Sequence, residues 1–128
     1  MYANDGAGRW DGNVAGLVRE AIESGKAGEL VAAIAPGEDD IVLLKSGYSA
    51  FDATPLAAIL AELGVDIVAL AGTATEMCVF QTALDGRRAG FDVSVRADAS
   101  ATVDAKNEKI ALDYLERVLG VEVARPSE

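Results

Sequence analysis

Residues 71–83 read Ala71-Gly72-Thr73-Ala74-Thr75-Glu76-Met77-Cys78-Val79-Phe80-Gln81-Thr82-Ala83, and the rest of the chain can be interpreted around them. The apolar run at 66–70 is typical of a buried strand, and apolar residues at helical spacing follow Cys78. We therefore expect Cys78, the only cysteine of the chain, where a strand ends, a glycine turn follows and a helix begins.

Two spacings could start this helix. Thr73 and Glu76 fit a capping box, whereas Thr75 as the N-cap would make Cys78 the third helical residue. Either start places backbone N–H groups and the positive end of the helix dipole near the sulfur, an environment that favours a nucleophilic thiolate. The same N–H groups could hold an oxyanion. The alternative is that Cys78 is a small buried hydrophobic residue.

Composition limits the possible function classes. The 128 residues, 51% hydrophobic and 25% charged, are enough for one globular domain with a core, expected over residues 1–128. A net charge of −10 without a cluster of basic residues argues against nucleic acid and membrane partners. The single cysteine fits a cytoplasmic location. Since the chain has no histidine, a Cys-His pair and a His-ligated metal are excluded, and we expect no metal and no cofactor.

The first forty residues carry weaker signals than the rest. Residues 1–5 are typical of the end of a strand, and the glycine-rich segment 6–12 lacks the third glycine of a dinucleotide-binding fingerprint. Asn13 can be the N-cap of a helix that runs to Ser24. Residues 30–34 are expected to form a short extra strand.

Strands and helices alternate from residue 41 onward, which predicts an α/β domain with a mainly parallel sheet. Parallel sheets bind ligands at the carboxyl ends of their strands, where Lys45, the 72–78 turn and residues 97–98 are expected. We expect strands at 41–45, 66–70, 91–95 and 121–123, and helices at 54–63, from the cysteine turn to 89, and at 105–119. The expected buried faces are Leu56, Ile59, Leu60 and Leu63 in the first of these helices, and Ile110, Ala111, Tyr114, Leu115 and Val118 in the last.

Several of these segments together resemble the isochorismatase-like cysteine hydrolases in order and spacing, over about residues 1–105. They are Lys45-Ser46-Gly47-Tyr48-Ser49-Ala50-Phe51, Thr54-Pro55-Leu56, the 72–79 segment, Thr82-Ala83, Gly90 and Asp98-Ala99. The resemblance implies a three-layer, doubly wound α/β fold of six parallel strands. It also implies an Asp-Lys-Cys triad that hydrolyses small amides, ureido compounds or an enol ether.

The resemblance implies roles for individual residues. Cys78 corresponds to the thiol nucleophile and Lys45 to the triad lysine, for which the alternative is a strand-end lysine in solvent. The backbone N–H groups of Ala74 and Cys78 correspond to an oxyanion hole, next to a cis peptide bond just before Ala74. The candidate substrate-binding residues are Trp10, Tyr48, Phe51 and Thr75.

The sequence departs from the family at its start. Family members begin with a strand that carries the triad aspartate and with a helix, whereas this sequence begins within what resembles their second strand. No Asp occupies the matching position, and Asp5, Asp52 and Asp98 are expected in turns or caps. We therefore expect a domain that is truncated before residue 1 and is weakly active or inactive.

Three functions remain open from the sequence. The first is hydrolysis of a small amide or ureido C–N bond through the Cys78 thiolate. The second is a non-catalytic remnant that binds a partner or metabolite, and in either case a gap in the sheet would favour a homodimer or higher homo-oligomer. The third is a phosphoacceptor receiver domain, which the order of residues disfavours because the lysine comes early and no acidic pair follows the opening strand.

Overall fold

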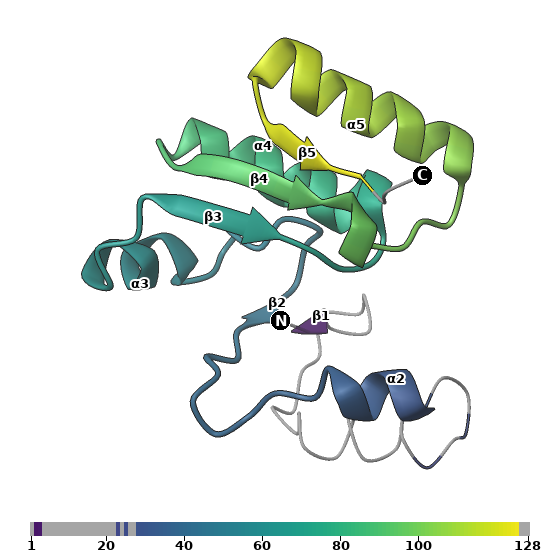
Figure 1. Cartoon of the computed structure of the whole chain (residues 1–128). Helices are drawn as coiled ribbons and strands as arrows, with labels where there is room; N and C mark the ends of the chain where they lie inside the picture. The colour runs from purple at the N-terminus through teal and green to yellow at the C-terminus, as the bar shows by residue number, and fades with distance from the viewer. Residues whose placement is uncertain (1, 4–22, 24, 26–27, 126–128) are drawn as a thin grey trace. The chain divides into compact units, whose positions relative to one another are not determined.

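A computed structural model describes residues 2–3, 23, 25 and 28–125 of the chain (Figure 1). The chain divides into two compact units, residues 1–46 and residues 47–128. The expectation of one domain over the whole chain stays a prediction. The glycine-rich segment 6–12 lies outside the described residues, as does nearly all of the helix expected between Asn13 and Ser24. None of the described helices is long and apolar enough to cross a membrane.

The first unit contains β1 (Tyr2–Ala3), α2 (Gly28–Ala33) and β2 (Leu44–Lys45). The two strands pair in parallel, with Tyr2 opposite Leu44 and Ala3 opposite Lys45, and each lies in a segment where the sequence predicts a strand. The prediction of a short strand at residues 30–34 is wrong, because residues 30–33 belong to helix α2. Its Glu, Leu and Ala residues favour a helix, and an apolar run this short does not distinguish a strand from a helix.

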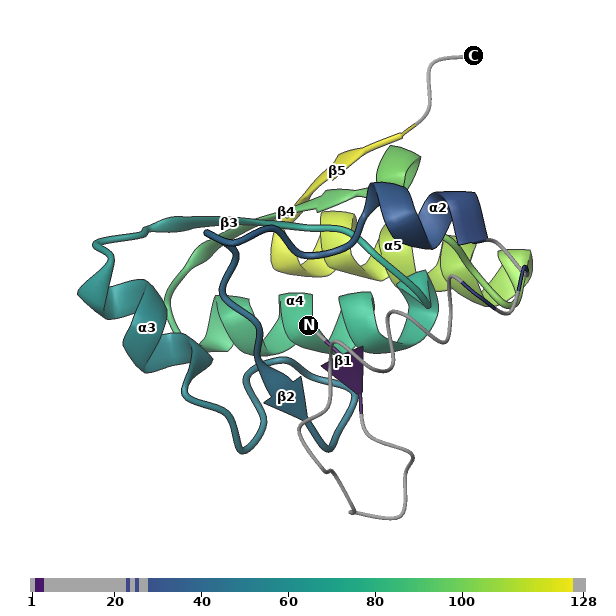
Figure 2. The same cartoon turned by 90° about the horizontal axis from the view of Figure 1, so that it is seen from below.

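The second unit is built on a sheet of three parallel strands. β3 (Ile67–Leu70), β4 (Asp92–Arg96) and β5 (Glu122–Ala124) lie in that order, with Val68 opposite Val93 and Val95 opposite Val123. Figure 2 shows α4 (Phe80–Arg88) and α5 (Ala105–Leu119) on the same side of this sheet. The α/β fold with parallel strands is therefore confirmed.

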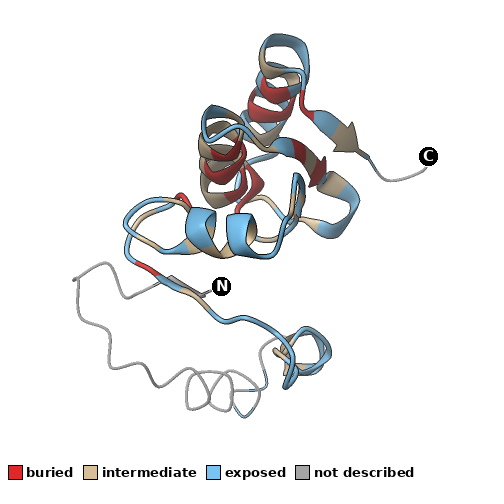
Figure 3. Ribbon diagram, turned by 90° about the vertical axis from the view of Figure 1, so that its left-hand side faces the viewer, coloured by how far each residue is buried: buried red, intermediate tan, exposed pale blue. Residues whose placement is uncertain are grey.

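The core of the second unit lies between the sheet and the helices α4 and α5. Val93 and Val95 are buried in β4 while Asp92 and Arg96 are exposed, which is the alternation that the sequence predicts for this strand. Figure 3 shows the buried residues gathered where the two helices meet the sheet. The core cluster consists of Val79, Ala83, Val93, Val95, Leu112, Leu115 and Val121.

Helix α5 has the predicted bounds but buries a different face. Ala111 and Leu115 are buried as expected and Leu112 joins them, whereas Ile110 is 59% and Val118 60% exposed. Tyr114 is exposed as well, although its ring contacts that of Phe80. The apolar stripe of α5 is therefore wider than the face that packs on the sheet.

Two further burial predictions differ from the structure. Helix α3 (Leu56–Glu62) contains no fully buried residue: Leu56, Ile59 and Leu60 of the expected face are half-buried, and Leu63 just after the helix is exposed. Strand β3 was expected to be buried, but Ile67 is exposed and alternate residues of the strand face outward. Within the described residues β3 pairs with β4 alone, so this strand forms an edge of its sheet.

Candidate active site

Cys78 lies in one turn of π-helix, Thr75–Val79, which connects the end of β3 to the start of α4. Ala74 precedes this turn in an extended conformation and serves as its N-cap, without a side-chain hydrogen bond to the turn. Both predicted caps, the Thr73–Glu76 box and Thr75, are therefore wrong. Single π-helical turns inside helices occur frequently at functional sites.

The backbone before the turn has two unusual features. The peptide bond between Thr73 and Ala74 is cis, which confirms the cis bond that the resemblance implied at this place. Gly72 has a φ of 137°, in a region that residues with a side chain rarely adopt. A glycine therefore stands where the strand must leave the sheet and enter the turn.

The turn is held by the segment that follows β4. The backbone N–H and the hydroxyl of Thr75 both donate to the carbonyl oxygen of Ala101, at 3.0 and 3.2 Å. The N–H of Ala101 donates in return to the carbonyl oxygen of Gly72 at 3.0 Å. Ser100 adds a contact, since its hydroxyl accepts from the N–H of Gly72 at 3.2 Å. The turn that carries the thiol is thus fixed to residues distant in sequence.

The carboxylate of Glu76 extends this connection. One of its oxygens accepts from the N–H groups of Val103 and Asp104, both at 3.1 Å, and the other accepts from the hydroxyl of Thr102 at 2.7 Å. A hydrogen bond from its own backbone N–H, followed by the bond from Thr102 and those from Val103 and Asp104, lowers the pKa of Glu76 below its ordinary value. Glu76 is therefore hydrogen-bonded to the segment 102–104. The sequence had instead predicted a local capping box with Thr73.

Several N–H groups of the turn already have acceptors. That of Thr75 donates to Ala101, and those of Met77 and Val79 donate to the carbonyl oxygen of Ala74, at 3.1 and 3.3 Å. These three N–H groups are therefore unavailable to a ligand. The predicted oxyanion hole concerns the N–H groups of Ala74 and Cys78 and stays a prediction.

The two predicted triad members lie in different units. Cys78 is half-buried, while Thr75 and Val79 beside it in the turn are buried, so the thiol is not part of the core cluster. Lys45 is a buried residue at the end of β2 in the first unit. The predicted role of Lys45 beside the thiol stays a prediction.

The candidate substrate-binding residues have different environments. Tyr48 is exposed, and the ring of Phe51 stacks on that of Phe91 with their centroids 5.8 Å apart. Thr75 has no exposed surface and its hydroxyl is bonded to Ala101, so the prediction that Thr75 binds substrate is not supported. Trp10 lies outside the described residues.

The structure also bears on the aspartates considered as substitutes for the triad base. Asp98 forms a double ion pair with Arg96, with contacts of 2.8 and 2.6 Å, and these hydrogen bonds lower its pKa. This agrees with its predicted place in a turn. Asp52 is exposed in the turn after Ser49, and Asp5 lies outside the described residues. No group of three or more potential metal ligands occurs among the described residues.

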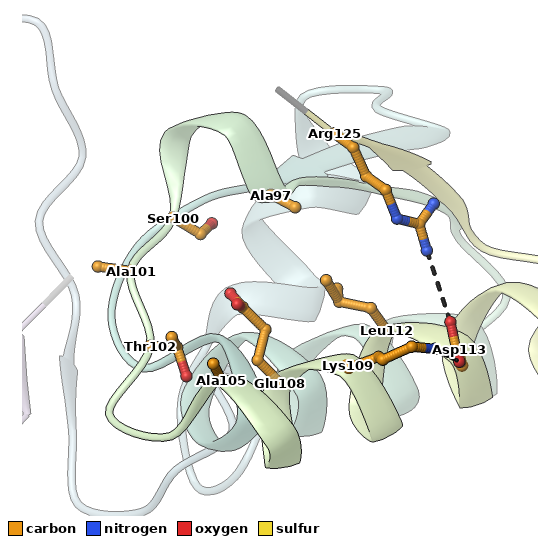
Figure 4. A pocket seen from close by; sticks show the side chains of 10 residues that line it. All are labelled: Ala97, Ser100, Ala101, Thr102, Ala105, Glu108, Lys109, Leu112, Asp113 and Arg125. Atoms are coloured by element: carbon orange, nitrogen blue, oxygen red, sulfur yellow. Dashed lines mark hydrogen bonds and ion pairs between the residues drawn. The ribbon is translucent and has the colours of Figure 1, made fainter. Parts of the chain in front are cut away.

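Two cavities adjoin helix α5. Figure 4 shows one of about 720 Å³, into which the carboxylate of Glu108 points and beside which Asp113 and Arg125 form an ion pair. The other, of about 540 Å³, borders the cysteine turn through Glu76, Met77 and Phe80. Cys78 is not among the described residues that line either cavity.

Sequence reasoning missed the residues that hold the turn. The sequence predicts a loop over residues 97–102 at the carboxyl end of a strand, but no contact of Ser100, Ala101 or Thr102 with the cysteine turn. The available signal was the run of hydroxyl-bearing residues after β4, at the sheet edge where the cysteine turn was also expected. The pairing itself links residues about 26 positions apart and leaves no local pattern.

Comparison with known proteins gives consistent matches. The chain matches the isochorismatase domain over residues 11–125. It is 29% identical to YaaI, an uncharacterized isochorismatase family protein of Bacillus subtilis, over 123 residues that cover 96% of this chain and 67% of YaaI. It is 38% identical to the maleamate amidohydrolase of Pseudomonas putida over 75 residues, 59% of this chain and 35% of that enzyme.

A solved structure shows the same similarity. The nicotinamidase of Staphylococcus aureus superposes with a TM-score of 0.69 and 30% sequence identity, over 80% of this chain and 63% of that enzyme. The chain therefore spans from 35% to 67% of the length of these three proteins.

Proposed function

The chain belongs to the isochorismatase family, and we propose that Cys78 is the thiol nucleophile of an enzyme that hydrolyses a small amide or ureido C–N bond. Several of the relatives are named as amide hydrolases: maleamate amidohydrolase, ureidoacrylate amidohydrolase and nicotinamidase. The observation that carries the proposal is the position of Cys78, half-buried in a fixed π-helical turn at the carboxyl end of β3.

The proposed reaction has two stages. The Cys78 thiolate attacks the carbonyl carbon, a C–S bond forms, and the carbonyl oxygen becomes an oxyanion. When the intermediate collapses, the C–N bond breaks and the leaving nitrogen takes up the proton that the thiol released. Water then attacks the resulting thioester, or the thiocarbamate in the ureido case, and releases the acid while the thiol is restored.

The turn supplies the oxyanion contacts in this proposal. The N–H groups of Thr75, Met77 and Val79 are bonded to carbonyl oxygens and are not available. As the resemblance implies, we assign the oxyanion to the N–H groups of Ala74 and Cys78. Lys45 keeps the proposed role of a cation that favours the thiolate. A cytoplasmic location and self-association of the chain stay predictions.

Alkylation of the thiol tests the nucleophile without knowledge of the substrate. The purified chain is treated with iodoacetamide at neutral pH, and the adduct is followed by mass spectrometry beside free cysteine under the same conditions. Since Cys78 is the only cysteine, every thiol adduct reports on it. We expect faster alkylation than free cysteine, slowed in Lys45→Met. A rate no faster than that of free cysteine overturns the proposal and favours a non-catalytic binding role.

A second assay addresses the reaction. Nicotinamide, maleamate and ureidoacrylate are each incubated with the chain, and ammonia release is measured against Cys78→Ala as the matched control. Release by the wild-type chain that Cys78→Ala abolishes supports the proposal. Release that persists in Cys78→Ala would place the reaction away from the thiol and would contradict it.

A further inference from the structure

We propose that Glu76 is a positioning residue for Cys78, because its carboxylate fixes the π-helical turn to the segment 102–104 that leads into α5. This inference rests on the proposed function of Cys78 as a nucleophile. The relevant feature is a carboxylate two residues before the thiol whose oxygens are occupied by hydrogen bonds from outside the turn.

Three contacts define the anchor. The N–H groups of Val103 and Asp104 share one oxygen of Glu76, and the hydroxyl of Thr102 donates to the other. The hydroxyl of Thr102 also accepts from the N–H of Asp104 at 3.0 Å, which closes a compact network around the carboxylate. A side chain with three donors from a neighbouring segment restrains both segments more strongly than a single contact does.

The anchor continues into a rigid element. The carboxylate of Asp104 accepts from the N–H groups of Lys106 and Asn107, both at 2.9 Å, and so caps the start of α5. Further along this helix Leu115 is fully buried in the core cluster. Glu76 therefore connects the thiol-bearing turn to a helix that the core holds in place, which is the support that a reacting group needs.

A second support acts on the other side of the turn. The backbone of Ala101 forms hydrogen bonds with the backbone of Gly72 and of Thr75, so the same loop contacts the chain on both sides of Ala74. Ser100, Ala101 and Thr102 stand together along this loop in Figure 4. Only the contacts of Glu76 require a side-chain carboxylate. A substitution of Glu76 can therefore remove them while the backbone hydrogen bonds of Ala101 with Gly72 and Thr75 remain.

The same contacts argue against a role for Glu76 as the general base. A base must accept a proton at the working pH, and efficiency is greatest when its pKa lies near that pH. Hydrogen bonds from its own backbone N–H and from Thr102, Val103 and Asp104 lower the pKa of Glu76, and the three donors of the segment 102–104 already occupy its oxygens. The carboxylate is suited to hold a structure in one geometry and unsuited to shuttle a proton.

The test compares Glu76→Ala with Glu76→Gln. Glutamine keeps an oxygen that can accept from Val103 and Asp104, whereas alanine keeps no acceptor. We expect Glu76→Ala to slow alkylation of Cys78 by iodoacetamide about tenfold or more, because a loosened turn no longer holds the sulfur beside the N–H groups and helix start that favour the thiolate. Glu76→Gln should stay within about twofold of the wild-type rate, as the geometry is kept. Glu116→Ala, which removes a carboxylate of α5 that pairs with Arg125, is the matched control and should leave the rate unchanged.

The sign of the change separates positioning from a charge effect. Removal of a negative charge near the sulfur would by itself favour the thiolate and speed alkylation in both Glu76 variants. Faster alkylation in both variants, or equal rates in all three proteins, overturns the proposal. Thermal unfolding is followed in parallel, and rates are compared well below the unfolding temperature, so that a loss of stability alone does not change them.

Two further outcomes are covered. If Glu76→Ala does not fold, Thr102→Ala removes one of the three contacts and should slow alkylation by a smaller factor, whereas an unchanged rate overturns the proposal. If wild-type Cys78 reacts no faster than free cysteine, the proposed function fails before any variant is compared. Failure of the positioning role and failure of the nucleophile are therefore distinguishable.

Discussion

The hydroxyl of Thr82 in α4 accepts a hydrogen bond of 2.9 Å from the backbone N–H of Ala50, and both residues are buried. This bond connects the loop that carries Tyr48 and Phe51 to the helix that follows the cysteine turn. Within the second unit, the candidate binding loop and the candidate nucleophile are therefore attached to one element.

Loss of this hydroxyl should destabilise the fold. In Thr82→Val the shape of the side chain is nearly kept, but the N–H of Ala50 remains buried without its acceptor, at a cost of about 1–3 kcal/mol. Urea denaturation measures the change in the free energy of unfolding. Thr82→Ser keeps the acceptor and should be more stable than Thr82→Val. Wild-type stability in Thr82→Val would show that water replaces the hydroxyl.

A pair of substitutions in α5 tests which face of this helix is buried. Leu115 has no exposed surface, and Leu115→Ala should cost about 2–5 kcal/mol because a cavity remains in the core. Val118 lies three residues later and is exposed, so Val118→Ala should change stability by less than about 0.5 kcal/mol. Denaturation curves of the two variants give both values. A large loss in Val118→Ala would show that this face is covered in solution.

The end of α5 gives a test of backbone conformation alone. Gly120 caps the helix with a φ of 64°, and a Cβ added there would meet no atom within 4 Å. Gly120→Ala should therefore cost about 1–2 kcal/mol through the left-handed conformation itself. Gly120→Asn should lose less, since asparagine tolerates this region better than alanine. Thermal unfolding of the two variants checks their order, and equal stability would contradict this explanation.

The sequence predicted most reliably those elements whose signals are local. Helix α5 was predicted with its observed bounds because an amphipathic spacing of fifteen residues ends at a glycine. The parallel sheet followed from the alternation of apolar runs and helices. The exposed face of α5 could not be predicted, because Ile110 and Val118 have the same apolar character as residues that do pack on the sheet.

The candidate site was predicted in position but not in its contacts. The place of Cys78 after a strand and a glycine turn followed from residues 66–78 alone. The local spacing of Thr73, Thr75 and Glu76 suggested a cap, since capping rules assume that partners lie within one turn. In the structure the side chains of Thr75 and Glu76 form hydrogen bonds with Ala101 and Thr102, which follow β4. Contacts between segments so far apart in sequence cannot be predicted from local sequence patterns.

The ion pair between Arg96 and Asp98 predicts how stability depends on pH. Hydrogen bonds from the guanidinium lower the pKa of Asp98 in the folded chain, and the same contact raises the pKa of Arg96. A carboxyl group with a lowered pKa contributes stability above its unfolded value of about 3.9, and this contribution is lost as the pH falls through the folded value.

The free energy of unfolding is measured between pH 6 and about pH 3 for the wild type and Asp98→Asn. We expect a constant difference above about pH 5 that shrinks as the pH falls below about 4, because protonated Asp98 and asparagine are both neutral. Arg96→Gln should reproduce the loss, and adding Asp98→Asn to it should cost little more, since the two residues share one interaction. A difference that grows at low pH would mean that the folded state holds Asp98 protonated, contrary to its contacts with Arg96.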